Sequence, residues 1–388
     1  MKLTKVLSLI LALAMLLTLC ACGSKQAETT PNTQEPAAEA PAEAASEPAE
    51  AEDKTAPAEE DLGEPVVLTA INAFAENDFA AICISHFCDL VEEESGGNIT
   101  FNRYFGGTFC TVPEEFGYVS SGAADFCTIL QDTALEQLLY WNTAVSGRDM
   151  NEAMDVCNYI FFENPETAAL CEQQAEEAGV KILGVQTSGL IANVSTKPCA
   201  SYADMQGMNY GTDFGSASYA AMGLNIVSTT IADVYEGLSR GLIDCSGSSL
   251  SAVVAYKWYE VAPYILICTE SSTANFFTFN RDRWNSLTEA QQALLQRGVD
   301  ETIEWEMEYY QTLVDGWIQT LEDAGCTVGY FTEEDDLTKL KVQLAVTYQS
   351  YLDLAKNLGQ LDNYNMIMEA TFDYLGFDMQ ELLDEYGV

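Results

Sequence analysis

Histidine is almost absent from this sequence, since His86 is the only one among 388 residues. No Cys-x-x-Cys spacing occurs either, so the usual ligand sets of a zinc site are missing, and we expect no metal and no cofactor. The chain also lacks a Gly-x-Ser-x-Gly segment and a phosphate-binding loop. His86 falls in an amphipathic helical stretch, where a structural role is the ordinary one. We therefore expect no enzyme.

Basic residues are scarce. The chain has 16 Lys and Arg against 60 Asp and Glu, which gives a net charge of -44. Because phosphate recognition needs a basic surface, nucleic acid is excluded as a partner. The acidic residues are spread along the whole chain, which indicates a solvated surface rather than an acidic active site.

Long uncharged apolar runs are missing beyond the N-terminus, where none reaches the roughly 18 residues of a membrane span. The one early run, Val6 to Leu19, follows two lysines and is typical of a signal peptide. It leads into Leu19 to Gly23, which resembles a bacterial lipobox with Cys22 as the lipid acceptor. We predict a lipoprotein signal peptide over 1–21 and a palmitate-bearing anchor on Cys22, on the extracytoplasmic face of the cell membrane.

Residues 22–64 are mostly Ala, Pro, Glu and Thr, with almost nothing to bury. Such a segment cannot offset the entropy of ordering, so we predict a disordered acidic tether. The remaining 65–388 is long enough for one large two-lobed unit or for two domains. Its ten cysteines stand mostly singly among apolar residues, so we expect buried reduced thiols more than disulfides.

Short apolar runs alternate with helical patterns along 65–388, which is an α/β signal. Glycines at the end of the first helix permit a left-handed cap. Thr288 is a plausible start for a final long helix. The expected strands are 65–71, 99–105, 126–130, 180–185, 242–245 and 274–280, and the expected helices include 77–94 and 289–324.

Five segments resemble, in the same order, the solute-binding subunit of TRAP transporters, the family that includes the C4-dicarboxylate-binding proteins. No single segment is specific, but five in order over about 200 residues are hard to obtain by chance. They are 87–97 with its Glu-Glu-Glu-Ser-Gly-Gly ending, 119–125, 202–210, 233–244 and 280–287.

The resemblance implies an α/β, two-lobed, periplasmic-binding-protein-like fold with crossing strands and a long hinge helix. Lobe I would hold 65–188 and about 276–315, and lobe II would hold 189–275 and about 316–388. It implies no catalysis. The partners would be a small organic solute and the TRAP permease subunits in the membrane.

The sequence departs from the resembled family where that family clamps a carboxylate with arginine. Gly211 stands at the place of one arginine, and Ser188 to Asn193 supplies no basic residue for the second. A buried carboxylate without a partner is costly. The solute could be neutral or cationic, or backbone amides and hydroxyls at 211–212 and 246–249 could hold a carboxylate, or the correspondence could be shifted by a few residues.

The candidate ligand-binding residues come from segments that we expect at strand ends, where such clefts form. Trp258 is added because its ring could stack on a solute ring or cation. The full set is Phe74, Asn77, Thr128, Gln131, Asn209, Tyr210, Thr212, Ser246, Ser248, Ser249 and Trp258.

A second function fits the same fold. A lipoprotein that presents a ligand to a membrane sensor or another receptor would share this architecture, and the sequence alone does not separate it from a transport subunit.

Overall fold

The computed structural model describes residues 61–74, 76–130, 134–143, 146–187, 189–212, 216–269 and 274–387. The predicted signal peptide, the lipid acceptor Cys22 and nearly all of the tether lie outside these ranges, as does the candidate Gln131.

The first sheet of the described residues has the strand order β2-β1-β3-β10-β4. Strands β1, β2 and β3 are parallel, whereas β10 runs antiparallel to both β3 and β4. Its strands are β1 (Val66–Ile71), β2 (Ile99–Tyr104), β3 (Phe126–Leu130), β4 (Val180–Thr187) and β10 (Ala274–Asn280). The helices between them are α2 (Phe79–Glu94), η1 (Val112–Glu114), α3 (Glu115–Ser120), η2 (Tyr140–Asn142), α4 (Met150–Asn158), η3 (Tyr159–Glu163), α5 (Pro165–Glu177) and α10 (Arg281–Asn285).

The second sheet has the order β11-β9-β5-β8-β6-β7. Strand β5 is antiparallel to its neighbours β8 and β9, and the other pairs are parallel. Its strands are β5 (Ile191–Ser195), β6 (Asn209–Thr212), β7 (Asn225–Ser228), β8 (Cys245–Ser249), β9 (Tyr264–Cys268) and β11 (Thr327–Tyr330). Its helices are α6 (Tyr202–Met205), α7 (Ser216–Ala221), η4 (Ile231–Asp233), α8 (Val234–Ser239), α9 (Leu250–Ala255) and η5 (Trp258–Glu260).

One predicted strand is misplaced. The segment 242–245 was expected to be extended, but the backbone N–H groups of Leu242 and Ile243 both donate to the Gly237 carbonyl and close the end of α8. Leu242 is 63% exposed, and the strand begins only at Cys245. The apolar residues Leu242 and Ile243 therefore end a helix. Their N–H groups satisfy the Gly237 carbonyl, which has no partner within α8.

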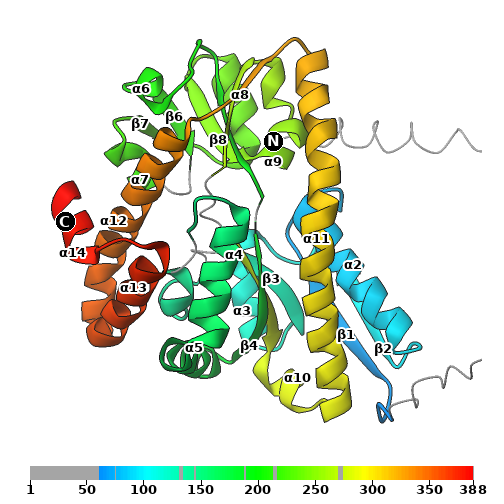
Figure 1. The fold of residues 1–388 in the computed structure, drawn as a ribbon. Helices are drawn as coiled ribbons and strands as arrows, with labels where there is room; N and C mark the ends of the chain where they lie inside the picture. Colours follow the sequence, from blue (N-terminus) through cyan, green and yellow to red (C-terminus); the bar gives the residue numbers. More distant parts are fainter. Residues whose placement is uncertain are drawn as a thin grey trace, which may run out of the picture. The chain divides into compact units, whose positions relative to one another are not determined.

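The two sheets are joined by two crossing segments and a helix. Strand β4 leads into β5 through 188–190, and β9 leads into β10 through 269–273. Helix α11 (Glu289–Asp323) contacts α2 and β4 on one side and α9 and β11 on the other, so it passes alongside both sheets (Figure 1). The predicted two-lobed α/β fold with crossing strands and a long hinge helix is confirmed.

Helix α11 begins where the sequence predicts. The Thr288 hydroxyl accepts the Gln291 N–H, and the Gln291 side chain accepts the Thr288 N–H, which forms a capping box. Its buried residues recur every three or four positions, as one face of an α-helix requires. These are Gln291, Leu294, Leu295, Gly298, Val299, Thr302, Glu306, Tyr310, Val314 and Leu321.

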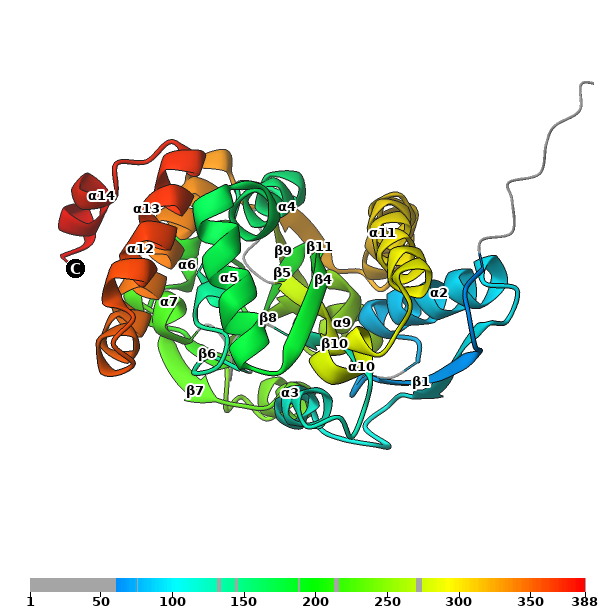
Figure 2. The ribbon, with the colours of Figure 1, turned by 90° about the horizontal axis from the view of Figure 1, so that it is seen from below.

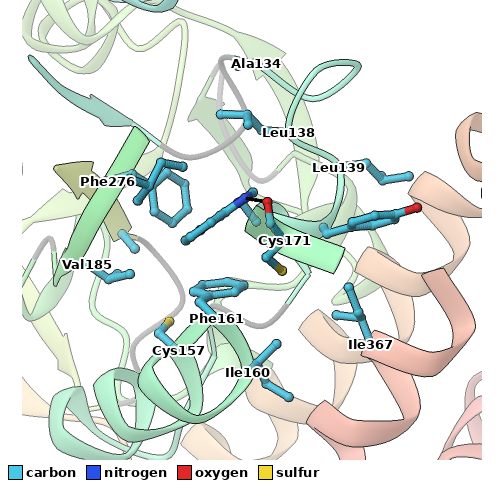
Figure 3. Close-up of a cluster of buried hydrophobic side chains, with 14 of the residues drawn as sticks. Ala134, Leu138, Leu139, Cys157, Ile160, Phe161, Cys171, Val185, Phe276 and Ile367 are labelled. Carbon is cyan, nitrogen blue, oxygen red and sulfur yellow. Dashed lines mark hydrogen bonds between the residues drawn. The ribbon is translucent and has the colours of Figure 1, made fainter. Parts of the chain in front are cut away.

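The last helices are α12 (Glu333–Asn357), α13 (Leu361–Leu375) and α14 (Met379–Tyr386). Helix α13 packs against α4 and α5 of the first sheet, away from α11 and α2 (Figure 2). The shared core centres on Trp141, whose ring lies 4.7 Å from that of Phe161 and 5.8 Å from that of Phe276. Trp141 Nε1 donates to the Cys171 carbonyl at 3.0 Å, so its polar atom is satisfied in the apolar cluster (Figure 3).

The cysteines behave as expected from their apolar surroundings. None of the ten in the described part of the chain forms a disulfide, and eight are buried. Their thiols fill core space as small apolar groups. None of the helices in the described ranges combines the length and apolar character that a membrane span requires.

Candidate functional site

The strand registers bring one edge of each sheet together. Thr187 at the end of β4 pairs with Ala274, and Leu130 at the end of β3 pairs with Asn275. In the second sheet, Ile191 at the start of β5 pairs with both Ser249 and Cys268. Because the crossing segments 188–190 and 269–273 are short, these two edges are adjacent. Polar residues at these strand ends are thereby placed between the two sheets.

The first sheet carries a polar group beyond β1. Asn72 is buried, its side-chain amide donates to Thr128 Oγ1 at 3.4 Å, and its oxygen accepts the Phe74 N–H at 2.9 Å. Thr128 is also buried, in β3. The structure therefore brings the candidates Thr128 and Phe74 together through Asn72, which the sequence reasoning missed.

Glu115 fixes the same loop from behind. It is fully buried in α3, and its Oε1 accepts the Ala73 N–H at 2.7 Å. Burial raises the pKa of the Glu115 carboxyl to about 7, although the hydrogen bonds from Ala73 and from the Cys127 thiol oppose this rise. A carboxyl group with a raised pKa therefore lies directly behind the loop that carries Phe74.

A second buried polar pair lies where β4 meets α11. Gln186 Nε2 donates to Glu306 Oε2 at 2.7 Å, and both side chains are fully buried. Burial, and then the Glu306 carboxylate, raise the pKa of the neighbouring Cys83 thiol well above its usual value. Cys83 therefore stays protonated and is not a nucleophile.

Tyr310 holds the first crossing segment. Its hydroxyl accepts the Leu190 N–H at 2.7 Å, and its ring meets that of Phe79 edge-on at 5.0 Å. Gly189 has a φ of +81°, and a Cβ there would lie 2.5 Å from the Tyr310 ring. Glycine is required at this position by both its backbone conformation and the close approach of the ring.

The second sheet brings hydroxyl groups to the shared edge. Thr212 is the last residue of β6, and Ser248 and Ser249 end β8. Ser246 and Ser248 were expected in a loop but belong to the strand itself, and Ser249 Oγ accepts the Ala252 N–H as the N-cap of α9. Ser246 is buried and donates to the Gly211 carbonyl at 2.7 Å, so its hydroxyl supports the sheet.

The remaining described candidates have different surroundings. Asn209 begins β6 at the opposite end, where its N–H donates to Asp244 Oδ2 at 3.0 Å. Tyr210 is fully buried against Tyr219 at 4.2 Å. Trp258 is 1% exposed in the core of the second sheet, and Asn77 is exposed before α2.

Gly211, and Ile191 in the segment 188–193 where the second arginine was sought, are both surrounded by packed apolar side chains. A Cβ on Gly211 would lie 2.5 Å from Ile243 Cδ1, so a side chain at this buried position would require Ile243 to shift. Ile191 lies 9% exposed in an apolar cluster with Tyr202 and Met208. No cationic group therefore reaches the shared edge from β5 or β6.

The missed polar residues differ in their sequence signals. Gln186 interrupts an apolar strand, and Glu306 falls in the buried stripe of α11, so each is a polar residue at a position that predicts burial. Glu115 gives no such signal, because α3 is short and acidic at its start. Among the described residues, no group of three or more His, Cys, Asp and Glu could hold a metal ion.

A family model described as bacterial extracellular solute-binding protein, family 7, matches residues 72–354. The chain belongs to this family. This family-7 protein is accordingly a solute-binding protein for small organic solutes, and it acts outside the cytoplasm. The family consists of transport proteins rather than enzymes.

The relatives of the family-7 protein are distant. A solute-binding protein of Sulfitobacter sp. strain NAS-14.1 is 22% identical over 279 residues, which are 71% of this chain and 84% of that protein. A TRAP periplasmic solute-binding protein of Sulfitobacter sp. NAS-14.1 with bound β-D-galacturonate has a TM-score of 0.64 at 18% identity, covering 78% of this chain and 100% of the other. One from Desulfovibrio salexigens with bound orotic acid has a TM-score of 0.65 at 16% identity, covering 79% and 99%. These structures share the fold.

Proposed function

We propose that this protein captures a small polar organic solute between the facing edges of its two sheets and delivers it to a TRAP-type permease. The observation that supports this proposal is the position of polar residues in strands that lead to the two crossing segments or lie beside them: Thr212 ends β6, Ser248 lies next to the end of β8, and Thr128 lies two residues before the end of β3. Hydroxyl and amide groups of this kind fix the orientation of a small ligand in a mostly apolar site.

The hinge elements support capture by closure. The segment 188–190 contacts α11 through the Leu190 to Tyr310 hydrogen bond, and α11 itself contacts both sheets. Two lobes joined by short connections and by helices that contact both of them can change their relative angle around such points. A bound solute would favour the closed arrangement because it contacts both edges.

The solutes of the structural relatives indicate the size and polarity to expect. One relative holds β-D-galacturonate and another holds orotic acid. Both are compact, rich in hydrogen-bonding groups and carry a carboxylate. The hydroxyl and amide groups at the shared edge suit the polar parts of such molecules.

We also propose that Cys22 carries a lipid and that 22–64 acts as a tether at the outer face of the cell membrane. The support is the order of charge, apolar run, small residue and cysteine in the sequence. Replacing Cys22 by Ala should abolish incorporation of a labelled fatty acid in a bacterial host, whereas Cys20→Ala should leave it intact. If Cys20→Ala abolished the labelling and Cys22→Ala did not, Cys20 would be the lipid acceptor.

Solute binding can be tested by thermal denaturation of the full chain against organic acids, sugars, nucleobases and amines. A compound that binds only the folded state raises the melting temperature in proportion to the logarithm of its concentration. Ser248→Ala should reduce that rise, and Ser286→Ala, an exposed serine in the turn after α10, serves as the matched control. A rise that is equal in all three proteins would place the site elsewhere.

A further inference from the structure

The carboxyl group of Glu115 supports two neighbouring segments of the first sheet at once. Its Oε1 accepts the N–H of Ala73, which follows β1, at 2.7 Å. Its other polar neighbour is the thiol of Cys127, in β3. Asn72 joins the same two segments, since its side-chain amide donates to Thr128 Oγ1 at 3.4 Å. Glu115 therefore contacts both of the segments that meet in this hydrogen bond.

These two segments lie at the same end of parallel strands. Ala70 of β1 pairs with Phe126 of β3, so the residues that follow β1 run beside the rest of β3. Strand β3 continues to Leu130, whose partner in β10 follows the crossing segment 269–273. Glu115 thus supports the part of the first sheet that the proposed function assigns to the solute.

The two protonation states of Glu115 make different hydrogen bonds. The side chain is fully buried, and its Oε2 accepts no hydrogen bond from a nitrogen or oxygen donor of the described residues. When Oε2 carries a proton, it can donate to the Cys127 sulfur, whose own hydrogen points to the Thr128 carbonyl at 3.4 Å. When Glu115 is ionised, it competes for that thiol hydrogen, because a thiol donates only one. Proton loss therefore weakens a contact of Thr128 and leaves a buried negative charge beside Ala73.

The other titratable groups that face Glu115 keep their charge near neutral pH. Burial raises the pKa of Cys110 to about 11 and that of Cys127 well above its usual value, so both thiols stay protonated. Glu114 is exposed, and hydrogen bonds from Thr111 lower its pKa, so it stays ionised. Strand β10, which also packs against α3, contains no titratable residue. Burial raises the pKa of the Glu115 carboxyl to about 7, so Glu115 is the member of this cluster that changes charge between pH 6 and pH 8.

We propose that solute binding by this protein is coupled to the protonation of Glu115, so that the protonated protein binds its solute more tightly. The inference rests on the proposed function and concerns the regulation of its site. Glu115 is a positioning residue, because it acts on the solute through the backbone of Ala73 and through Thr128. The protein then captures its solute more efficiently in acidic surroundings.

The direction of the coupling follows from burial. A solute against Thr128 and the loop 72–74 excludes water from the surroundings of the carboxyl group, which disfavours its ionised form further. The pKa of Glu115 is then higher in the complex than in the free protein, and binding takes up a proton. Affinity is complete below the pKa of the free protein and is lost as pH rises through the pKa of the complex. An anionic solute adds to the effect because it repels the carboxylate.

The test is titration calorimetry on the full chain at pH 6 and pH 8, with D-galacturonate, D-galactose, orotate and uracil as probes. None of the four changes its charge between these pH values. At pH 7 the titration is repeated in two buffers of different ionisation enthalpy, which gives the number of protons taken up on binding. Glu115→Gln removes the titrating group and keeps an oxygen for the Ala73 N–H. Glu114→Gln is the matched control, since it changes the adjacent exposed carboxyl and glutamine also suits its capping box with Thr111.

The wild-type protein should bind a probe about fivefold or more tightly at pH 6 than at pH 8, with uptake of a fraction of a proton at pH 7. Glu114→Gln should behave in the same way. In Glu115→Gln the affinities at the two pH values should agree within about twofold, and no proton should be taken up. If Glu115 were merely structural, Glu115→Gln would weaken binding equally at both pH values and leave the pH dependence in place.

Three results would overturn the inference and leave the proposed function standing. One is a wild-type affinity that is equal at pH 6 and pH 8 without proton uptake, which requires no variant to fold. Another is an affinity that rises with pH. The third is a pH dependence that survives Glu115→Gln. If neither these probes nor any compound of the wider panel bound to the full chain, both the inference and the proposed function would be wrong.

Discussion

The stability of this protein should depend on pH through Glu115. The pKa of its carboxyl is raised from 4.5 to about 7 in the folded state, chiefly by burial. Because the folded state holds the proton more tightly, this contribution is fully present below the unfolded pKa and is lost as pH rises through the folded pKa. The free energy of unfolding should thus fall by about 2.5 kcal/mol from this group between pH 5 and pH 8.

Glu115→Gln isolates this effect. The amide keeps an oxygen that can accept the Ala73 N–H, as Oε1 does at 2.7 Å, but it does not ionise. The added amide N–H groups face a buried region beside Cys127, which costs about 1–3 kcal/mol if they find no acceptor. That cost is the same at every pH. The difference in unfolding free energy between the two proteins therefore changes with pH only because of the carboxyl group.

The assay is urea unfolding of wild type and variant at pH 5 and at pH 8, with slopes compared to confirm equal exposed surface. The variant should gain about 2.5 kcal/mol relative to wild type on going from the lower to the higher pH. A relative change below about 1 kcal/mol would refute the reasoning, since it would mean that the carboxyl group is stabilised in its ionised form.

Other positions give simpler expectations. Gly211→Arg should destabilise the protein by about 1–3 kcal/mol, because its Cβ would overlap Ile243. The new arginine should not improve the binding of organic acids. Thermal denaturation with and without acid probes checks both points. Tyr310→Phe should lower the free energy of unfolding by about 1 kcal/mol and speed hydrogen exchange of the Leu190 amide. Unchanged exchange at Leu190 would mean that the crossing segment is held by other contacts. Thr288→Ala removes the N-cap of α11 and should cost about 1 kcal/mol in urea unfolding, whereas a loss near zero would show that tertiary packing alone fixes the helix start.

Local patterns predicted the elements well where each signal is contained in a few neighbouring residues. The strand 126–130 and the strand 274–280 have the predicted bounds, and α11 ends one residue before the predicted 324. These signals are short-range: an apolar run, a capping threonine and a stripe with helical spacing. The segment 242–245 was misread because its two apolar residues close a helix instead of starting a strand.

The candidate site was only partly accessible to the same reasoning. The rule that ligand residues follow strand ends selected Thr212 and Ser248, which lie at or next to the ends of β6 and β8, and Thr128, which lies within β3. It also selected Asn209, which begins β6, because a sequence does not reveal which end of a strand faces the other sheet. Trp258 was chosen for its ring instead, and it is buried.

The sequence by itself determined the fold class, the order of the elements and the absence of arginine at two positions near the site. Only the tertiary structure decided that Glu115, Glu306 and Lys339 are buried and that each contacts a residue distant in sequence. Each lies on a helix far from the strand ends in sequence, and its position depends on how that helix packs across the sheets. Burial and proximity are properties of that packing, so these contacts depend on long-range packing that no local pattern encodes.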